Sequence, residues 1–133
     1  MKEFDIVFVG DNRAILSLTS DIPSRADVET LFINNRADVE YVLYRRGLLI
    51  LTLKESGESI VCHNLVLSSA VSAVPGMFER DEKGKIITSE DHSVKNVPNI
   101  YVVGKCCDRP ETDRGTLKKI ADHIIAVNGY RGN

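Results

Sequence analysis

The stretch from Asn96 to Lys105 reads NVPNIYVVGK, and its order of turn, apolar run and glycine decides the fold. Pro98 indicates a turn, because proline fixes its own backbone and cannot donate a hydrogen bond within a central strand. The apolar run Ile100–Val103 predicts a buried strand. Gly104 marks the tight turn at which that strand ends. The segment therefore predicts an inner strand of a sheet that stops abruptly at Gly104.

The N-terminal segment predicts a strand, a helix and a second strand within about thirty residues, a βαβ unit. Phe4–Gly10 is an apolar run that ends in glycine, which is typical of a buried strand. Apolar residues then recur at helical spacing, at Ile15, Leu18 and Ile22. We expect Pro23 with Ser24 to end this helix, because proline does not continue one, and Val28–Ile33 to form the second strand.

Three antiparallel strands are expected in the middle of the chain, at Val39–Tyr44, Leu48–Lys54 and Ser59–His63. Polar turns that contain glycine join them at 45–47 and 55–58, which favours a β-meander. Leu65–Leu67 is a further apolar run that should return to the parallel sheet.

A last helix is expected after residue 111, with Thr112 or Asp113 as its N-cap and Gly129 at its end. Its buried face should consist of the apolar residues at helical spacing, which are Leu117, Ile120, Ala121, Ile124 and Val127.

Length and composition predict one domain over residues 1–133, large enough to bury a core without disulfides or metal. The net charge of −2 gives no electrostatic footprint for nucleic acid or an anionic membrane. No apolar run approaches the roughly 18 residues that a membrane span needs, and no secretory leader is visible. We therefore expect a cytoplasmic protein that binds neither nucleic acid nor a membrane.

The chain has three cysteines, an odd count that suits a reducing compartment better than a disulfide framework. Cys106 and Cys107 are adjacent and could form a strained vicinal disulfide or bind a soft metal, but cysteines after a strand more often serve as small packing residues. Neither a C-x-x-C pair nor a Cys/His cluster at zinc spacing is present, so we expect no metal site.

The NVPNIYVVGK segment resembles the closing motif of the thioredoxin reductase group of flavoproteins, which runs approximately T-x-V-P-G-I-Y-A-A-G-D. Gly84–Thr88, Gly104, and Asp108–Pro110 leading to Arg114 are similar to the family in the same register. The resemblance extends from Phe4 to about Asn128. It implies an α/β FAD/NAD(P)-binding fold, a Rossmann-like three-layer ββα domain with a parallel sheet and an antiparallel β-meander.

Members of this family carry an inserted NADPH-binding domain with the redox cysteine pair, and this chain leaves no room for it. The chain passes from Pro75–Met77 to Glu79–Asp81 almost directly. We therefore expect neither NADPH binding nor a nicotinamide site, and only the FAD domain of the family.

The phosphate-binding loop of such a domain reads G-x-G-x-x-G, in which the second glycine lets the backbone approach the pyrophosphate and the third lets the helix pack closely. Here Gly10 keeps the first position, whereas Asn12 and Ile15 replace the other two. Ile15 should push the helix outward, and Asp11 should repel a diphosphate unless it points away. Asparagine is the mildest of these changes, because it tolerates left-handed backbone angles.

Other cofactor positions implied by the resemblance are changed as well. Asn34 stands where the family has an acidic residue that binds the adenosine ribose, and Lys105 replaces the aspartate that holds the ribitol of FAD. The alanine-threonine-glycine turn of the family appears as Ser68–Ala70. These losses of charge-assisted hydrogen bonds lead us to expect no tightly bound FAD.

Three functional interpretations follow, and the first is a cofactor-free relic of a flavoprotein domain that binds or regulates another protein. Because the family dimerises through its FAD domain, a homodimer is the first partner to expect. The second is a module that still binds FAD in an altered pose, or a smaller nucleotide, with Arg13 and Lys105 facing the phosphate cavity next to a helix N-terminus, and works with a separate redox partner.

The third interpretation is an enzyme, which has the least support because no acid, base and nucleophile are tied together by spacing. We expect His63, His92 and His123 to be surface residues. Cys106 and Cys107 would be redox-sensitive only if Lys105 lay close enough to lower a thiol pKa.

Overall fold

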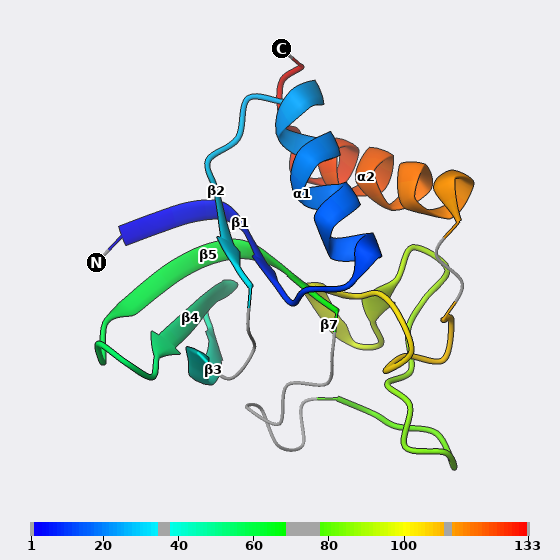
Figure 1. Cartoon of the computed structure of the whole chain (residues 1–133), viewed down its shortest axis with the longest axis horizontal. Coiled ribbons are helices and arrows are strands. Elements are labelled where there is room, and N and C mark those ends of the chain that lie inside the picture. The colour runs from blue at the N-terminus through cyan, green and yellow to red at the C-terminus, as the bar shows by residue number, and fades with distance from the viewer. Residues whose placement is uncertain (1, 35–37, 69–77, 111–112, 133) are drawn as a thin grey trace.

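A computed structural model of the chain describes residues 2–34, 38–68, 78–110 and 113–132. Four parallel strands form its centre, in the order β2 (Thr30–Ile33), β1 (Lys2–Val9), β5 (Ser59–Leu67) and β7 (Val97–Val102). The βαβ unit expected at the N-terminus is present, since β1 and β2 pair in parallel (Figure 1). β2 begins at Thr30, two residues later than we expected, because Val28 packs against the helices instead.

The meander consists of β3 (Val39–Arg45), β4 (Leu48–Leu53) and the first half of β5, all antiparallel. Ser59–His63 and Leu65–Leu67 form one strand, β5, rather than two, while Leu65–Leu67 returns to the parallel sheet as we expected. The polar residue between them, Asn64, is completely buried, and its amide donates to the Tyr130 hydroxyl at 2.7 Å. A buried polar group with partners does not interrupt a strand.

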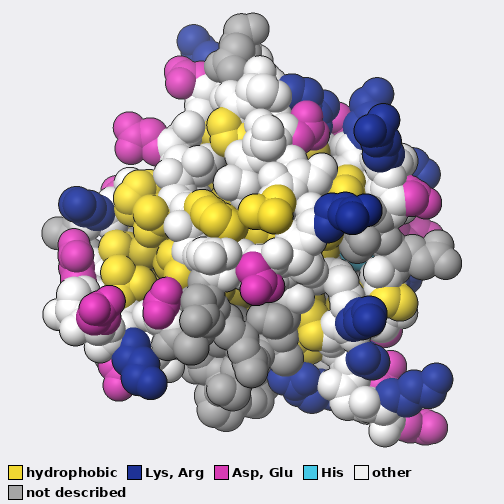
Figure 2. Space-filling model, viewed as in Figure 1, with side chains coloured by type: hydrophobic (Ala, Val, Ile, Leu, Met, Phe, Trp, Pro, Cys, Tyr) yellow, Lys and Arg dark blue, Asp and Glu magenta, His cyan; other side chains and the backbone are white. Residues whose placement is uncertain are grey.

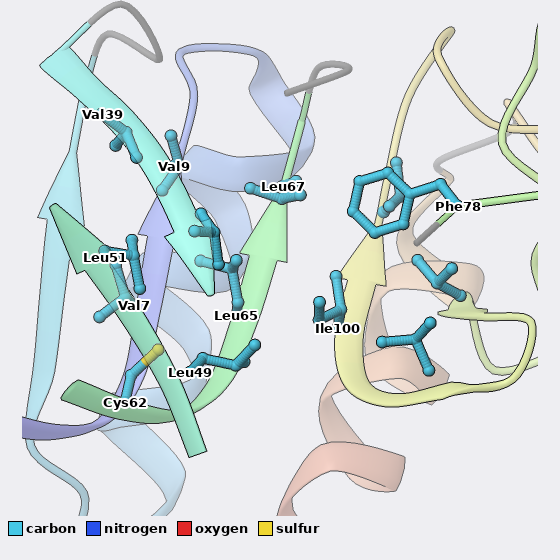
Figure 3. Packing of buried hydrophobic residues seen from close by; sticks show 14 of the residues in the cluster. Val7, Val9, Val39, Leu49, Leu51, Cys62, Leu65, Leu67, Phe78 and Ile100 are labelled. Atoms are coloured by element: carbon cyan, nitrogen blue, oxygen red, sulfur yellow. The ribbon is translucent and has the colours of Figure 1, made fainter. Parts of the chain in front are cut away.

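Two helices, α1 (Arg13–Arg25) and α2 (Arg114–Asn128), cover one face of the parallel sheet, and the meander lies across the other (Figure 1). Side chains of β1 alternate between the two sides. Ile6 and Phe8 join the core beneath the helices, whereas Val7 and Val9 join the core that Figure 3 shows beside the meander. The expected three-layer ββα arrangement is confirmed.

The first helix, α1, ends later than the sequence led us to expect. Pro23 lies inside α1, which continues to Arg25, because the Ala26 N–H still donates to the Ile22 carbonyl at 3.0 Å. Proline removes only its own N–H, so the residues after it can complete the last turn. α1 therefore ends one residue beyond the Pro23–Ser24 pair at which we expected it to end.

In α2 the N-cap is Asp113, whose carboxylate accepts from the Thr116 N–H at 2.7 Å, and Thr112 lies outside the described residues. Gly129 ends the helix with a φ of +65°. Val127 was expected in the buried face but is 60% exposed, because it lies at the edge of the apolar stripe in the last turn. The other four apolar positions of that stripe are buried, as expected.

The NVPNIYVVGK segment forms β7 and its flanking turns. Our expectation of a turn at Pro98 was wrong, because β7 already begins at Val97 and the turn lies before it, at Asn96. A short strand, β6 (Ser93–Val94), precedes it and pairs with it antiparallel. Asn96 and Asn99 adopt left-handed backbone angles, with φ of +64° and +76°, which asparagine tolerates better than most residues. Within the described part of the chain, no helix is long and apolar enough to cross a membrane.

Candidate functional site

Three parallel strands end close together. Gly10 directly follows β1, Ser68 directly follows β5, and Gly104 lies two residues after β7. A Cβ atom at Gly10 would lie 1.6 Å from the Ser68 Oγ, and one at Gly104 would lie 2.6 Å from the Asn12 Nδ2. Both glycines also have positive φ values, +133° and +103°. Only glycine fits at these two positions without a shift of the neighbouring atoms.

Asn12 is the N-cap of α1 and fills the turn above these strand ends. Its Oδ1 accepts from the Ile15 N–H at 2.9 Å, and its Nδ2 donates to the Ser68 carbonyl at 3.4 Å. Its φ of −75° and ψ of 166° are extended, so the left-handed tolerance that we invoked for Asn12 is not used. Ile15 is completely buried within the core beneath the helices.

A pocket of about 480 Å³ opens at the start of α1, where it brings together most of the candidate residues. It is lined by Asn12, Arg13, Ala14, Ser68, Gly104, Lys105, Cys106 and Pro110. Gly10 is next to this pocket through its contact with Ser68. Ser69 and Ala70, which the resemblance also implicates, lie outside the described residues.

The charge at this pocket is positive. Arg13 and Lys105 are both exposed, and neither has an ion-pair partner among the described residues. The first turn of α1 contains no acidic residue, and the helix dipole directs partial positive charge toward the same space. The arrangement can therefore attract a small anion.

Asn34 lies apart from this pocket, although the resemblance places it in the same cofactor site. It lines a second pocket of about 380 Å³, between the end of β2 and the tip of the meander. The other residues of that lining are Leu31, Phe32, Ile33, Asp38, Leu53, Glu55 and Ser56. This second pocket could not be identified from the sequence, because its lining comes from two strands and the segments next to them and contains no recognisable motif.

Cys106 and Cys107 are free thiols in the turn after β7. Burial, and then the neighbouring Cys107, raise the pKa of Cys106 to about 11, while Lys85 and Arg80 lower it only in part. Burial likewise raises the pKa of Cys107, whose Sγ donates to the carbonyls of Gly104 and Arg109. The thiol pKa values are raised, so neither thiol is activated as a nucleophile.

The histidines do not form a catalytic arrangement with this pocket. His92 was expected at the surface but is only 3% exposed, because its ring lies over β7 and Nδ1 donates to the Val102 carbonyl at 3.1 Å. His123 Nε2 lies 3.0 Å from Asp91 Oδ2, and His63 Nε2 lies 2.6 Å from Glu3 Oε1. Among the described residues, no group of three or more His, Cys, Asp and Glu is arranged for a metal.

The contact between Asp91 and His123 links the loop before β6 to α2. Burial would raise the pKa of this carboxyl, but hydrogen bonds from the Ser93 hydroxyl and N–H, together with the charge of His123, lower the pKa below its ordinary value of 3.8. The Ser93 hydroxyl donates to Asp91, so it is not poised as a nucleophile.

The residues at the first pocket match FAD poorly. The Asn12 amide occupies the turn that a diphosphate would approach, and its Nδ2 lies directly against Gly104. Lys105 presents an ammonium group, which cannot accept hydrogen bonds from ribitol hydroxyls. Asn34, at the implied ribose position, opens into a different pocket.

No protein-family profile and no curated protein sequence matches the chain. Its fold is similar to that of bacillithiol disulfide reductase from Staphylococcus aureus, with a TM-score of 0.66 and 9% identity over 95% of this chain and 99% of that chain. Thioredoxin reductase from T. acidophilum matches with a TM-score of 0.36 and 12% identity, over 94% of this chain and 53% of the reductase. The Lactococcus lactis thioredoxin reductase matches with a TM-score of 0.34 and 12% identity, over 97% and 53%. The chain thus spans about half the length of these two thioredoxin reductases, and it has the Rossmann-like FAD/NAD(P)-binding fold that it shares with bacillithiol disulfide reductase.

Proposed function

We propose that this chain is a non-catalytic binding module, built on the FAD-domain fold of flavoprotein reductases, that does not hold FAD tightly. The observation that supports this proposal most strongly is the position of Asn12. Its side chain caps α1 and bridges to the Ser68 carbonyl, at the place where the family keeps a glycine for the pyrophosphate.

The energetic cost of restoring the cofactor is considerable. Displacing the Asn12 cap would cost about 1 kcal/mol. Each charge-assisted hydrogen bond missing at Asn34 and Lys105 is worth a further 1.5–3 kcal/mol or so. Because about 1.4 kcal/mol is a tenfold change in affinity, these losses together weaken FAD binding by several powers of ten.

Around the first pocket, the cysteines and histidines are not arranged as a nucleophile, an acid or a base. The pKa of Cys106 is raised to about 11, which leaves almost no thiolate at neutral pH. Of the described histidines, His92 is bound to a backbone carbonyl, and His63 and His123 each face a carboxylate elsewhere on the surface. A binding role is therefore better supported than an enzymatic one.

A titration with FAD tests this proposal through a restored variant. The triple change Asn12→Gly, Asn34→Glu and Lys105→Asp returns family-like residues to three positions, and we expect it to bind FAD much more tightly than the natural chain. Lys119→Asp on the exposed face of α2 is the matched control, because it makes the Lys105 charge change away from both pockets. Tight FAD binding by the unmodified chain would contradict the proposal.

A second candidate function is the binding of a small phosphorylated ligand, such as a mononucleotide, in the first pocket. Arg13 and Lys105 favour it, since both line that pocket without a described ion-pair partner. Calorimetric titration with AMP and with inorganic pyrophosphate should then show binding that Lys105→Gln weakens. No measurable heat, or an unchanged affinity in the variant, would rule out this candidate.

A further inference from the structure

β2 forms an open edge of the parallel sheet. Within the described structure it pairs with β1 alone, and the carbonyls of Glu29 and Ile33 accept from the Ile6 and Gly10 N–H groups at 3.3 and 2.9 Å. Backbone groups alternate in direction along a strand, so the N–H and C=O of the even-numbered residues point away from β1. At Thr30 and Phe32 these groups have no hydrogen-bond partner among the described residues.

The second pocket adjoins this open edge and has an apolar floor. Leu31, Phe32, Ile33 and Leu53 provide its hydrophobic lining. Ile33 is buried, while Leu31 and Leu53 are half-buried. Figure 2 shows hydrophobic side chains gathered across the middle of the face that carries β2 in Figure 1. Phe32, on the same strand, is 36% exposed. The edge thus combines apolar surface with backbone groups that no described strand pairs.

The walls of the second pocket are acidic. Asp38 and Glu55 are both exposed, line the pocket, and have no ion-pair partner among the described residues. In the part of the chain that the structure describes, no lysine or arginine lines this pocket. A complementary occupant must therefore supply an apolar side chain for the floor and a basic side chain for the walls.

We propose that β2 and the second pocket dock an extended segment of a partner protein in which apolar and basic residues both lie at every second position, on the face that meets the pocket. The segment adds a strand to the sheet through the backbone of Thr30 and Phe32, and its side chains supply the specificity. A second copy of β2 is a poor occupant, because its sequence TLFI contains no basic residue to face Asp38 and Glu55. This inference rests on the proposed binding role and specifies the chemistry of the partner segment.

The test uses a capped hexapeptide with valine, lysine and valine at positions 1, 3 and 5 and threonine at the other positions, labelled for fluorescence anisotropy and added to the full chain. We expect saturable binding, and protection of the Thr30 and Phe32 amide protons from hydrogen exchange when the peptide is bound. Two matched peptides serve as controls: one with glutamate in place of lysine, and one with N-methyl groups on its valines. Both should bind at least about tenfold more weakly, since the first is repelled and the second loses strand hydrogen bonds.

Variants then locate the site. The double change Asp38→Asn and Glu55→Gln should lower the affinity for the lysine-valine peptide roughly 2- to 30-fold, the range that two exposed ion pairs give. Glu58→Gln is the matched control, because Glu58 is exposed but does not line the pocket. Both variants should retain the native circular dichroism spectrum, as these side chains make no ion pairs with described residues.

Several results would overturn the inference. These are no binding of the lysine-valine peptide at millimolar concentration, equal binding of the glutamate peptide, exchange protection elsewhere, or an unchanged affinity in the double variant. Protection of the same two amides by self-association, seen as a dimer in sedimentation, would assign the edge to a second copy instead. FAD binding by the natural chain would contradict the proposed function alone, so the two failures are distinguishable.

Discussion

Asn12 offers a sharp test of the local structure, because its two polar atoms have different roles. Oδ1 caps α1 through the Ile15 N–H at 2.9 Å, and Nδ2 reaches the Ser68 carbonyl only at 3.4 Å. Loss of an N-cap side chain to alanine costs about 1 kcal/mol, within a range of roughly 0.5–2 kcal/mol. The longer hydrogen bond should add little, since it lies beyond the usual 2.7–3.2 Å or so.

Three substitutions separate the cap from the rest of the side chain. Asn12→Ala should destabilise the fold by about 1 kcal/mol, whereas Asn12→Gly should cost only a few tenths, because glycine is accepted at this position. Asn12→Asp keeps the capping oxygen and should be neutral, or stabilising by up to about 1 kcal/mol, because the first turn of α1 has no other acidic residue.

Urea unfolding followed by circular dichroism measures this series as differences in the free energy of unfolding. Thermal melting should give the same order, with Asn12→Ala lower by about 3–5 °C. Asp113→Ala removes the corresponding cap from α2 and serves as a control away from the pocket. If Asn12→Asp lost as much stability as Asn12→Ala, that result would refute the cap and assign the effect to packing against Gly104.

Three further predictions address other parts of the fold. Gly10→Ala should destabilise the chain by about 2–5 kcal/mol in urea unfolding, because its φ is +133° and the new Cβ would meet Ser68; a loss below 1 kcal/mol or so would contradict this geometry. The pKa of Asp91 is lowered from 3.8, so its carboxylate stabilises the fold above pH 3.8, and this contribution is lost as the pH falls through the lower folded-state pKa. Asp91→Asn should therefore reduce the loss of unfolding free energy between neutral and acidic pH. An unchanged pH dependence would refute this role of Asp91. Cys106, with its pKa raised to about 11, should react with iodoacetamide at pH 8 roughly 200-fold more slowly than a free cysteine, as measured by intact mass; equal rates would refute the raised pKa.

The elements of the parallel sheet and the layers around it could be predicted from the sequence, because they depend on local patterns. Phe4–Val9 and Ile100–Val103 are largely apolar runs, each followed directly by glycine, and they lie within or at the ends of inner strands. Ile15, Leu18 and Ile22 form a helical stripe, and all three are completely buried. In each case the residue type and its spacing determine the environment without knowledge of distant partners.

Other features depend on contacts between segments far apart in the sequence and could not be predicted. His92 is buried because the strand pair β6–β7 supplies a carbonyl for its ring, and Asn64 continues β5 because Tyr130 reaches it from the C-terminus. The grouping of Arg13 with Lys105 at one pocket, in contrast, was expected from the resemblance. The separation of Asn34 from them depends on where β2 ends relative to the meander.

The central claim is that this chain keeps the flavoprotein fold without tightly held FAD, and the visible absorption spectrum of the purified protein tests it most directly. The protein should be prepared without added flavin, and any molecule released by heat denaturation should be identified by mass spectrometry. We predict a spectrum without a flavin band, no released nucleotide, and no change when stoichiometric FAD is added and the excess is removed. A flavin band, or FAD in the released fraction, would contradict the claim.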